Sequence, residues 1–134
     1  MQPTPSPVVV PRHELVGTVI TGRGLGRALG APTANIALPT ARPARYGSYA
    51  AIVVVRGRVH RALAHVGVRP SIGGAEPLLE VHLLDFDGDL YGVAMRVRLL
   101  RKVSDEMTLA SLALLRRKIA DDVRRVRAFF RRCR

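Results

Sequence analysis

The hydrophobic pattern of this chain changes period once, near Thr108, and this change separates a β part from a helical part. From Glu14 to Arg101 the apolar residues form short runs that glycine and proline interrupt, a pattern typical of strands and turns. After Thr108 they recur at steps of three and four with arginines between them, which predicts one amphipathic helix. The apolar positions of this helix are Leu112, Leu115, Ile119, Val123, Val126 and Phe130.

Two of the apolar runs are arranged as a hairpin. Ser48 to Val55 and Val59 to Val66 lie on either side of Arg56-Gly57-Arg58. A third run, from Val93 to Leu99, alternates apolar residues with arginine, which indicates a half-buried strand. We expect about six strands in all, closing antiparallel into a barrel with the helix packed against it. The fold class is therefore α+β, dominated by β.

The run from Leu78 to Leu84 carries two polar residues with a shared orientation. Glu80 and His82 are two apart, so in a strand they point to the same side of the sheet. The four histidines of the chain show no metal-ligand spacing, and we expect them to be structural or exposed. His82 is kept open as a residue that tunes Glu80 or contacts a substrate. The histidines are His13, His60, His65 and His82.

The size of the chain predicts one domain. Its 134 residues, 48% of them apolar, provide enough material for a single hydrophobic core. The start holds four prolines and no signal-peptide pattern, so we expect a flexible leader over residues 1–12, a domain over 13–130 and a basic tail over 131–134. No apolar run approaches the roughly 20 residues that cross a bilayer. Cys133 has no partner for a disulfide, and a soluble, cytoplasmic monomer is expected.

The net charge of +12 is the main argument for a nucleic-acid partner. The charge is concentrated, because the segment from Arg96 to Arg134 holds eleven arginines and two lysines against four acidic residues. A solvated helix face explains this excess more simply than RNA binding does. The six aromatic residues include no tryptophan and form no interleaved stacking platform of the kind that single-strand binders use. We therefore expect no nucleic-acid partner and no membrane partner.

A glycine-rich segment follows the apolar run from Leu15 to Ile20. Glycine permits positive φ and lets backbone N–H groups converge on an anion, so such a segment can lie close to phosphates. It matches neither the dinucleotide fingerprint nor the Walker loop, and taken alone it is explained more simply as a flexible hairpin loop. Its glycines are Gly22, Gly24, Gly26 and Gly30, and it also contains Arg27.

The residues directly after this loop include two neutral oxygen ligands. Thr33 and Asn35 flank one residue, so in an extended chain they face the same way. A hydroxyl and an amide oxygen suit Mg²⁺, which takes few protein ligands and completes its octahedron with phosphate and water. The alternative is a polar turn after Pro32.

The string Leu29-Gly30-Ala31-Pro32-Thr33-Ala34-Asn35, with the glycine-rich loop before it, resembles the signature of riboflavin kinases. This family includes the kinase module of bacterial bifunctional FAD synthases. Further stretches resemble the family in the same order, and the resemblance runs from about residue 14 to residue 127. They are Gly47-Ser48-Tyr49, Val66 to Ser71 leading to Leu79-Glu80-Val81-His82, and Phe86 to Gly92.

This resemblance implies a closed Greek-key barrel with a C-terminal helix, and an enzyme that transfers the γ-phosphoryl group of ATP to riboflavin to give FMN. It implies that Thr33 and Asn35 hold Mg²⁺, that the loop from Gly22 to Gly30 covers the ATP phosphates, and that Glu80 is the catalytic base. A carboxylate suits that role, because it can accept the proton of the attacking ribityl 5′-hydroxyl. Arg27 adds a cation near the phosphates or remains a solvated loop residue.

In the family, the turn after the Glu80 strand and the C-terminal helix border the substrates. The resemblance therefore implies that Asp85 and Tyr91 shape the nucleotide or flavin pocket. It also implies that apolar residues at the start of the helix, including Leu109 and Leu112, offer a wall to the isoalloxazine ring. Core packing is the alternative for each of these leucines.

Four positions depart from the family pattern: Leu25, His65, Leu109 and Lys118. In the family a basic residue is common at position 25, asparagine at 65, phenylalanine at 109 and glutamine at 118. Bacterial members usually carry an adenylyltransferase domain as well, so we expect either a stand-alone kinase domain or a shortened piece of a longer protein. In both cases we do not expect it to make FAD by itself. Two other hypotheses remain open, a catalytically inactive flavin- or nucleotide-binding module and a basic β-barrel that binds RNA.

Overall fold

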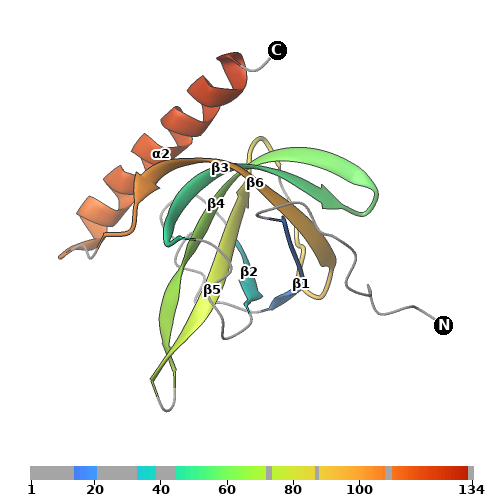
Figure 1. The fold of residues 1–134 in the computed structure, drawn as a ribbon, viewed down its shortest axis with the longest axis horizontal. Coiled ribbons are helices and arrows are strands. Elements are labelled where there is room, and N and C mark those ends of the chain that lie inside the picture. Colours follow the sequence, from blue (N-terminus) through green and yellow to red (C-terminus); the bar gives the residue numbers. More distant parts are fainter. Residues whose placement is uncertain are drawn as a thin grey trace.

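A computed structural model describes residues 14–20, 33–38, 45–71, 74–86, 88–107 and 110–132. Six antiparallel strands form a closed barrel, and one long helix lies against the outside of it (Figure 1). This is the expected architecture, and it is confirmed. The strands are β1 (Glu14–Ile20), β2 (Ala34–Ala37), β3 (Gly47–Val55), β4 (Arg58–Ser71), β5 (Gly74–Leu83) and β6 (Ala94–Asp105), and the helix is α2 (Leu112–Arg132).

The strand order around the barrel is β1-β2-β5-β4-β3-β6, and β6 pairs with β1 to close it. Strands β3, β4 and β5 pair successively, while β6 returns to lie beside β3. This is the Greek-key arrangement. It brings β2 next to β5, so two strands separated by the whole β3–β4 hairpin become neighbours.

The β3–β4 hairpin turns at Arg56 and Gly57, as expected. Both residues have positive φ, 52° and 75°, as the central pair of a type I′ turn requires. The strands pair without interruption from Val55 and Arg58 back to Gly47 and Val66. Strand β4 then continues past Val66 to Ser71 and pairs along its length with β5.

The interior of the barrel is filled by alternate residues of every strand. Successive strand side chains point to opposite faces, so each apolar residue inside has outward-facing neighbours. The fully buried interior side chains include Ile36, Val53, Val66, Leu79, Val81, Met95 and Val97. The barrel therefore has a dry, close-packed centre, and any chemistry takes place on its outside or at its ends.

Helix α2 begins later than the hydrophobic pattern predicts. We expected it from Thr108, but it starts at Leu112, and Ser111 caps it. The backbone N–H of Leu114 donates to the Ser111 hydroxyl oxygen (3.2 Å), and the N–H of Leu115 donates to the Ser111 carbonyl (3.1 Å). A serine at this position satisfies N–H groups that have no partner within the helix.

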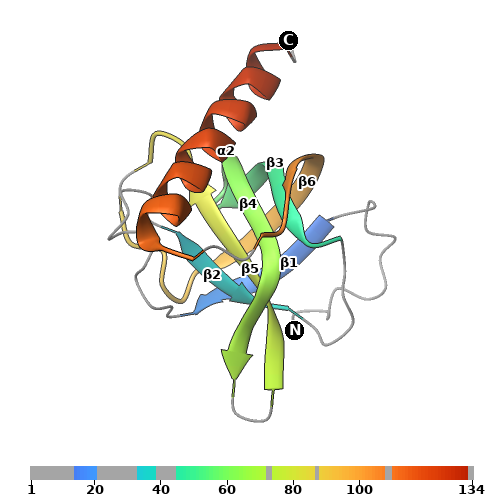
Figure 2. The same ribbon diagram turned by 90° about the vertical axis from the view of Figure 1, so that its left-hand side faces the viewer.

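The apolar face of α2 packs on the outer face of β3, β4 and β6 (Figures 1 and 2). Val126 and Phe130 are buried there against Ala50 of β3, Leu63 of β4 and Leu84. The predicted amphipathic helix is therefore confirmed, with its arginines largely on the solvent side. In the part of the chain that the structure describes, no helix is long and apolar enough to cross a membrane.

Phe130 should be a main anchor of the helix. Its ring is buried and also receives the Arg61 guanidinium, 5.1 Å from the ring centroid. We predict that Phe130→Ala lowers the free energy of unfolding by about 3 kcal/mol, because it leaves a cavity between helix and barrel. Arg132→Ala, on the exposed face of the same turn, should change it by less than about 0.5 kcal/mol. Chemical denaturation followed by circular dichroism measures both, and equal effects would contradict the packing described here.

Candidate active site

Five polar residues lie in register across five neighbouring strands on the outer face of the barrel. Ser104 of β6 pairs with Ser48 of β3, Ser48 with His65 of β4, His65 with Glu80 of β5, and Glu80 with Asn35 of β2. We call this set the polar row. Paired residues in adjacent antiparallel strands have Cβ atoms about 5 Å apart, so each member lies beside the next.

Strand alternation explains why these side chains are outside. The residues on either side of each of Asn35, His65 and Glu80 point into the barrel core. Because successive side chains of a strand point to opposite faces, Asn35, His65 and Glu80 point outward. The row is therefore a consequence of apolar patterning within each strand and of the register between strands.

Glu80 lies in the middle of the row and is half-buried. Burial raises the pKa of its carboxyl, the nearby His65 lowers it, and the carboxylate of Glu106 raises it again, with a net rise above the ordinary value. A carboxylate with a raised pKa is a better proton acceptor. The position and the environment of Glu80 therefore suit a general base.

Asn35 places a neutral oxygen next to Glu80, and Thr33 lies two residues before Asn35. Asn35 is 9% exposed and is the strand partner of Glu80, and Thr33 lies just before β2 and is half-buried. Among the described residues, no group of three or more His, Cys, Asp or Glu side chains is placed to hold a metal. The donor set of Thr33 and Asn35 fits a hard cation that obtains its other ligands from phosphate and water.

His65 is held on both sides of its ring. Its Nδ1 lies 3.1 Å from the Ser48 hydroxyl oxygen, and its Nε2 lies 2.7 Å from Oε1 of Glu106. Gly67 leaves room for this pair, because a Cβ there would lie 2.9 Å from Oε2 of Glu106 and 3.0 Å from Nε2 of His65. The imidazole is therefore fixed beside Glu80.

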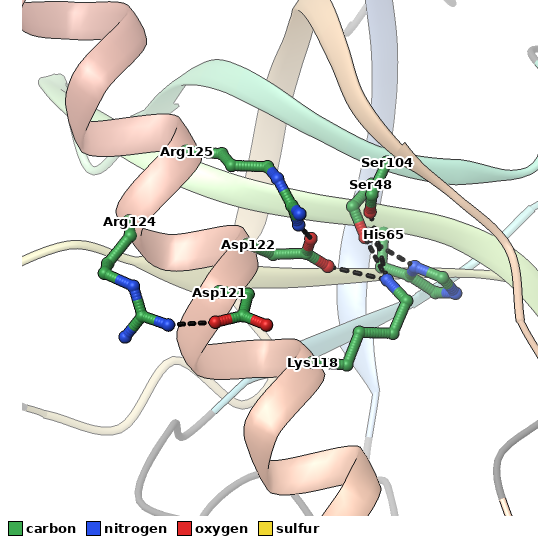
Figure 3. Close-up of polar contacts among 8 residues, drawn as sticks. All are labelled: Ser48, His65, Ser104, Lys118, Asp121, Asp122, Arg124 and Arg125. Atoms are coloured by element: carbon green, nitrogen blue, oxygen red, sulfur yellow. Dashed lines mark hydrogen bonds and ion pairs between the residues drawn. The ribbon is translucent and has the colours of Figure 1, made fainter.

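Helix α2 closes the Ser104 end of the row through a buried ion pair (Figure 3). The Lys118 ammonium donates to Oδ2 of Asp122 at 2.7 Å, to the hydroxyl oxygen of Ser104 at 3.0 Å and to that of Ser48 at 3.4 Å. Asp122 is 2% exposed, and its Oδ1 also accepts from Arg125 at 3.2 Å. Burial raises the pKa of Asp122, but hydrogen bonds from Lys118, Ser104 and Ser48 outweigh this and keep the pKa below its ordinary value.

Comparison with known proteins identifies the family. A family model described as "Flavokinase: Riboflavin kinase" matches residues 10–130. The chain belongs to the riboflavin kinase family. Asn35 and Glu80, two of the residues singled out by the resemblance, are thus paired across β2 and β5 of this family member.

The relatives of this riboflavin kinase family member are mostly longer proteins. Bifunctional riboflavin kinase/FMN adenylyltransferases of Haemophilus influenzae and Escherichia coli are 39% and 41% identical over 119 and 115 residues, which is 88% and 85% of this chain. The chain spans only 39% and 37% of their length. An RNA-binding riboflavin kinase of Bacillus subtilis is 36% identical over 110 residues, covering 81% of this chain and 47% of the relative.

Solved structures share the fold. The riboflavin kinase of Trypanosoma brucei superposes with a TM-score of 0.61 at 24% identity, over 89% of this chain and 80% of that one, and this likeness shows the fold alone. A Streptococcus pneumoniae protein described as a macrolide-efflux protein superposes with a TM-score of 0.76 at 30% identity, over 85% of this chain and 38% of that one. The barrel with its C-terminal helix is thus a known architecture.

The remaining predicted site residues are not members of the polar row, and several of them lie outside the described residues. Asp85, just after β5, binds Arg127 of α2 with two hydrogen bonds of 3.0 and 3.2 Å, which lower the pKa of its carboxyl. Tyr91 is 63% exposed, and Leu112 is 61% exposed. The structure does not bring Asp85 or Tyr91 to Glu80, and their roles stay predictions. Outside the described residues lie Gly22, Gly24, Gly26, Arg27, Gly30 and Leu109.

Sequence reasoning missed the buried ion pair that joins the helix to the polar row. Lys118 and Asp122 are four apart, a spacing that pairs opposite charges on one helix face. Asp122 also lies among the apolar positions of α2, where a charged residue needs a buried partner. These two signals together could have indicated a buried ion pair, but neither could have indicated Ser48 and Ser104 as its further partners.

The ion pair gives a prediction on stability and pH. We expect Asp122→Asn to lower the free energy of unfolding by about 3 kcal/mol at neutral pH, because it leaves the buried Lys118 ammonium without an opposite charge. The pKa of Asp122 is lowered in the folded state, so its contribution is present above the ordinary aspartate range and is lost as the pH falls through the lowered pKa. The difference between wild type and variant should therefore shrink on acidification.

Urea denaturation at several pH values measures this difference. Asp121→Asn is the matched control, because Asp121 pairs with Arg124 at the solvent side of the same turn and is 36% exposed. The loss of the Asp121 charge should lower the free energy of unfolding by less than about 1 kcal/mol. Equal costs for the two substitutions, or a difference that grows in acid, would contradict the buried pair.

Proposed function

We propose that this protein is a riboflavin kinase that transfers the γ-phosphoryl group of ATP to the ribityl 5′-hydroxyl of riboflavin, giving FMN and ADP. The observation that carries the proposal is the pairing of Glu80 with Asn35, which places a candidate base beside a candidate metal ligand in a chain of this family. The names of the bifunctional relatives contain a second activity. It is not part of the proposal, because the matched segment is the riboflavin kinase family domain.

Glu80 is the general base of the proposed reaction. Its carboxylate accepts the proton of the 5′-hydroxyl as that oxygen attacks the γ-phosphorus, and the bond to the ADP leaving oxygen breaks. Proton transfer of this kind contributes roughly 10²- to 10⁴-fold in rate. Phosphoryl transfer needs little further covalent help, so alignment and charge neutralisation supply the rest.

The family implies ATP and a divalent metal ion, and we propose Mg²⁺ as that ion. Thr33 and Asn35 would hold it, and when bound it would neutralise phosphate charge. The loop from Gly22 to Gly30 would cover the phosphates with backbone N–H groups, and Arg27 would add a cation there. These roles fit an active site in which the protein supplies few metal ligands.

The isoalloxazine ring is proposed to lie against the start of α2. Leu112 is 61% exposed and Leu114 46%, although both are large and apolar, and Met107 just before them is 57% exposed. Leucine side chains left open to solvent beside a polar site are suited to an aromatic ligand. Leu109 is proposed to belong to the same wall, and Asp85 and Tyr91 to the border of the nucleotide site.

The proposal includes a cytoplasmic monomer without a nucleic-acid partner. Only the absence of a nucleic-acid partner has structural support, from the pairing of helix arginines with aspartates: Arg124 with Asp121, Arg125 with Asp122, and Arg127 with Asp85. Arginines engaged in this way are less available to phosphates of RNA. Salt-dependent binding of an oligonucleotide would overturn this part of the proposal.

The decisive test is FMN formation from riboflavin, ATP and Mg²⁺ by the purified protein. We predict that Glu80→Gln lowers kcat roughly 10²- to 10⁴-fold, because the amide cannot accept the proton. Glu14→Gln, at the start of β1, is the matched control and should retain full activity. Circular dichroism checks that both variants are folded.

Other results of the FMN-formation assay distinguish between the alternative functions. FMN formation that survives Glu80→Gln would contradict the role of Glu80. A wild-type protein that binds flavin but makes no FMN would be a flavin-binding module. A protein that does neither would direct attention to its basic helix and to nucleic acid.

The metal assignment has its own test. We predict that Thr33→Ala raises the Mg²⁺ concentration for half-maximal activity about tenfold, the equivalent of losing about 1.4 kcal/mol of binding. Thr18→Ala, an exposed threonine on β1, is the matched control and should leave the Mg²⁺ dependence unchanged. A titration of activity with Mg²⁺ at saturating ATP measures this, and identical curves for the two variants would remove Thr33 from the site.

A further inference from the structure

Two residues at which this chain departs from the family pattern meet in the structure. His65 of β4 and Lys118 of α2 both contact the hydroxyl of Ser48, His65 through Nδ1 at 3.1 Å and Lys118 through Nζ at 3.4 Å (Figure 3). Ser48 is 2% exposed, so no bulk water competes for these contacts. The helix is thereby connected through one buried hydroxyl to the neighbour of the candidate base.

Each N–H of the Lys118 ammonium group has a hydrogen-bond acceptor. An ammonium group has three N–H donors, and Lys118 has three acceptors: Asp122, Ser104 and Ser48. The Ser48 oxygen therefore accepts from a cation. Ser48 is also a hydrogen-bond partner of Asp122 and of Nδ1 of His65.

The other side of the His65 ring contacts Glu106. Nε2 of His65 lies 2.7 Å from Oε1 of Glu106. The ring therefore joins the buried Ser48 hydroxyl to the Glu106 carboxylate.

We propose that His65 is a positioning residue for Glu80: Lys118, acting through Ser48, fixes the imidazole ring at its Nδ1 side, and the Nε2 side of the ring holds the Glu106 carboxylate away from the base. The inference rests on the proposed function. Glu106 and Glu80 are near enough that Glu106 raises the pKa of Glu80. A Glu106 carboxylate released from His65 would compete with the substrate hydroxyl for the space around Glu80.

The positioning role is tested by steady-state kinetics. The side-chain amide of His65→Gln retains an N–H in the place of Nε2, whereas His65→Leu retains none. We expect His65→Leu to lower kcat about tenfold with little change in the KM for riboflavin, and His65→Gln to recover to within about threefold of wild type. Equal kcat values for the two variants, or an effect confined to KM, would contradict positioning through Glu106.

A double-mutant cycle tests whether Lys118 acts through His65. Lys118→Met is combined with Asp122→Asn, so that no carboxylate is left buried without its partner, and thermal unfolding checks the fold. This double substitution should lower kcat about threefold when His65 is present and have no further effect in the His65→Leu background. Additive losses would show that Lys118 acts by another route, and Ser48→Ala takes its place in the cycle if the pair does not fold.

Failure of the proposed function and failure of the positioning role give different results. A wild-type protein without FMN formation would remove the proposed function, and the positioning role with it. A wild type that makes FMN, with equal kcat values for His65→Leu and His65→Gln, would leave the function intact and remove only the role of His65 and Lys118.

Discussion

The pairing of β2 with β5 is the constraint on which the rest of the site depends. It joins Asn35 and Glu80, which are separated in sequence by the whole β3–β4 hairpin, into one cross-strand pair. The barrel core fixes this register, since a slip by one residue would turn Ile36 and Leu79 out of the core. The energy that orders the site is therefore hydrophobic burial on the opposite face of the same strands.

The Lys118–Asp122 ion pair fixes the position of helix α2 against the barrel. Burying two charges is costly, and the cost is offset only where every hydrogen of the ammonium has an acceptor. Ser48 and Ser104 provide the acceptors that Asp122 does not, and they belong to β3 and β6. The start of α2, with its exposed Leu112, is thereby held at a defined place beside the polar row.

Much of the fold was predictable from sequence because its signals are local. The hairpin at Arg56-Gly57 and the alternation in β6 follow from residues that are close in the chain, and both are confirmed. The helix start was wrong by four residues, since the capping hydroxyl of Ser111 outweighs the apolar periodicity. The polar row was not predictable, because register between distant strands is set by packing and not by any motif. His65 and Lys118 were noted only as departures from the family pattern, and Ser48, which connects them, is 70 residues from Lys118.

The central claim is that the outer face of β2 and β5 is where phosphoryl transfer takes place. A crystal structure of the protein with Mg²⁺, ADP and FMN tests it most directly. We predict that the FMN phosphate lies beside Glu80, with the metal ion on the Thr33 and Asn35 oxygens and the flavin ring against Leu112. A flavin bound elsewhere, such as between Arg61 and Phe130 at the far end of α2, or a metal ion without contact to Asn35, would contradict the claim.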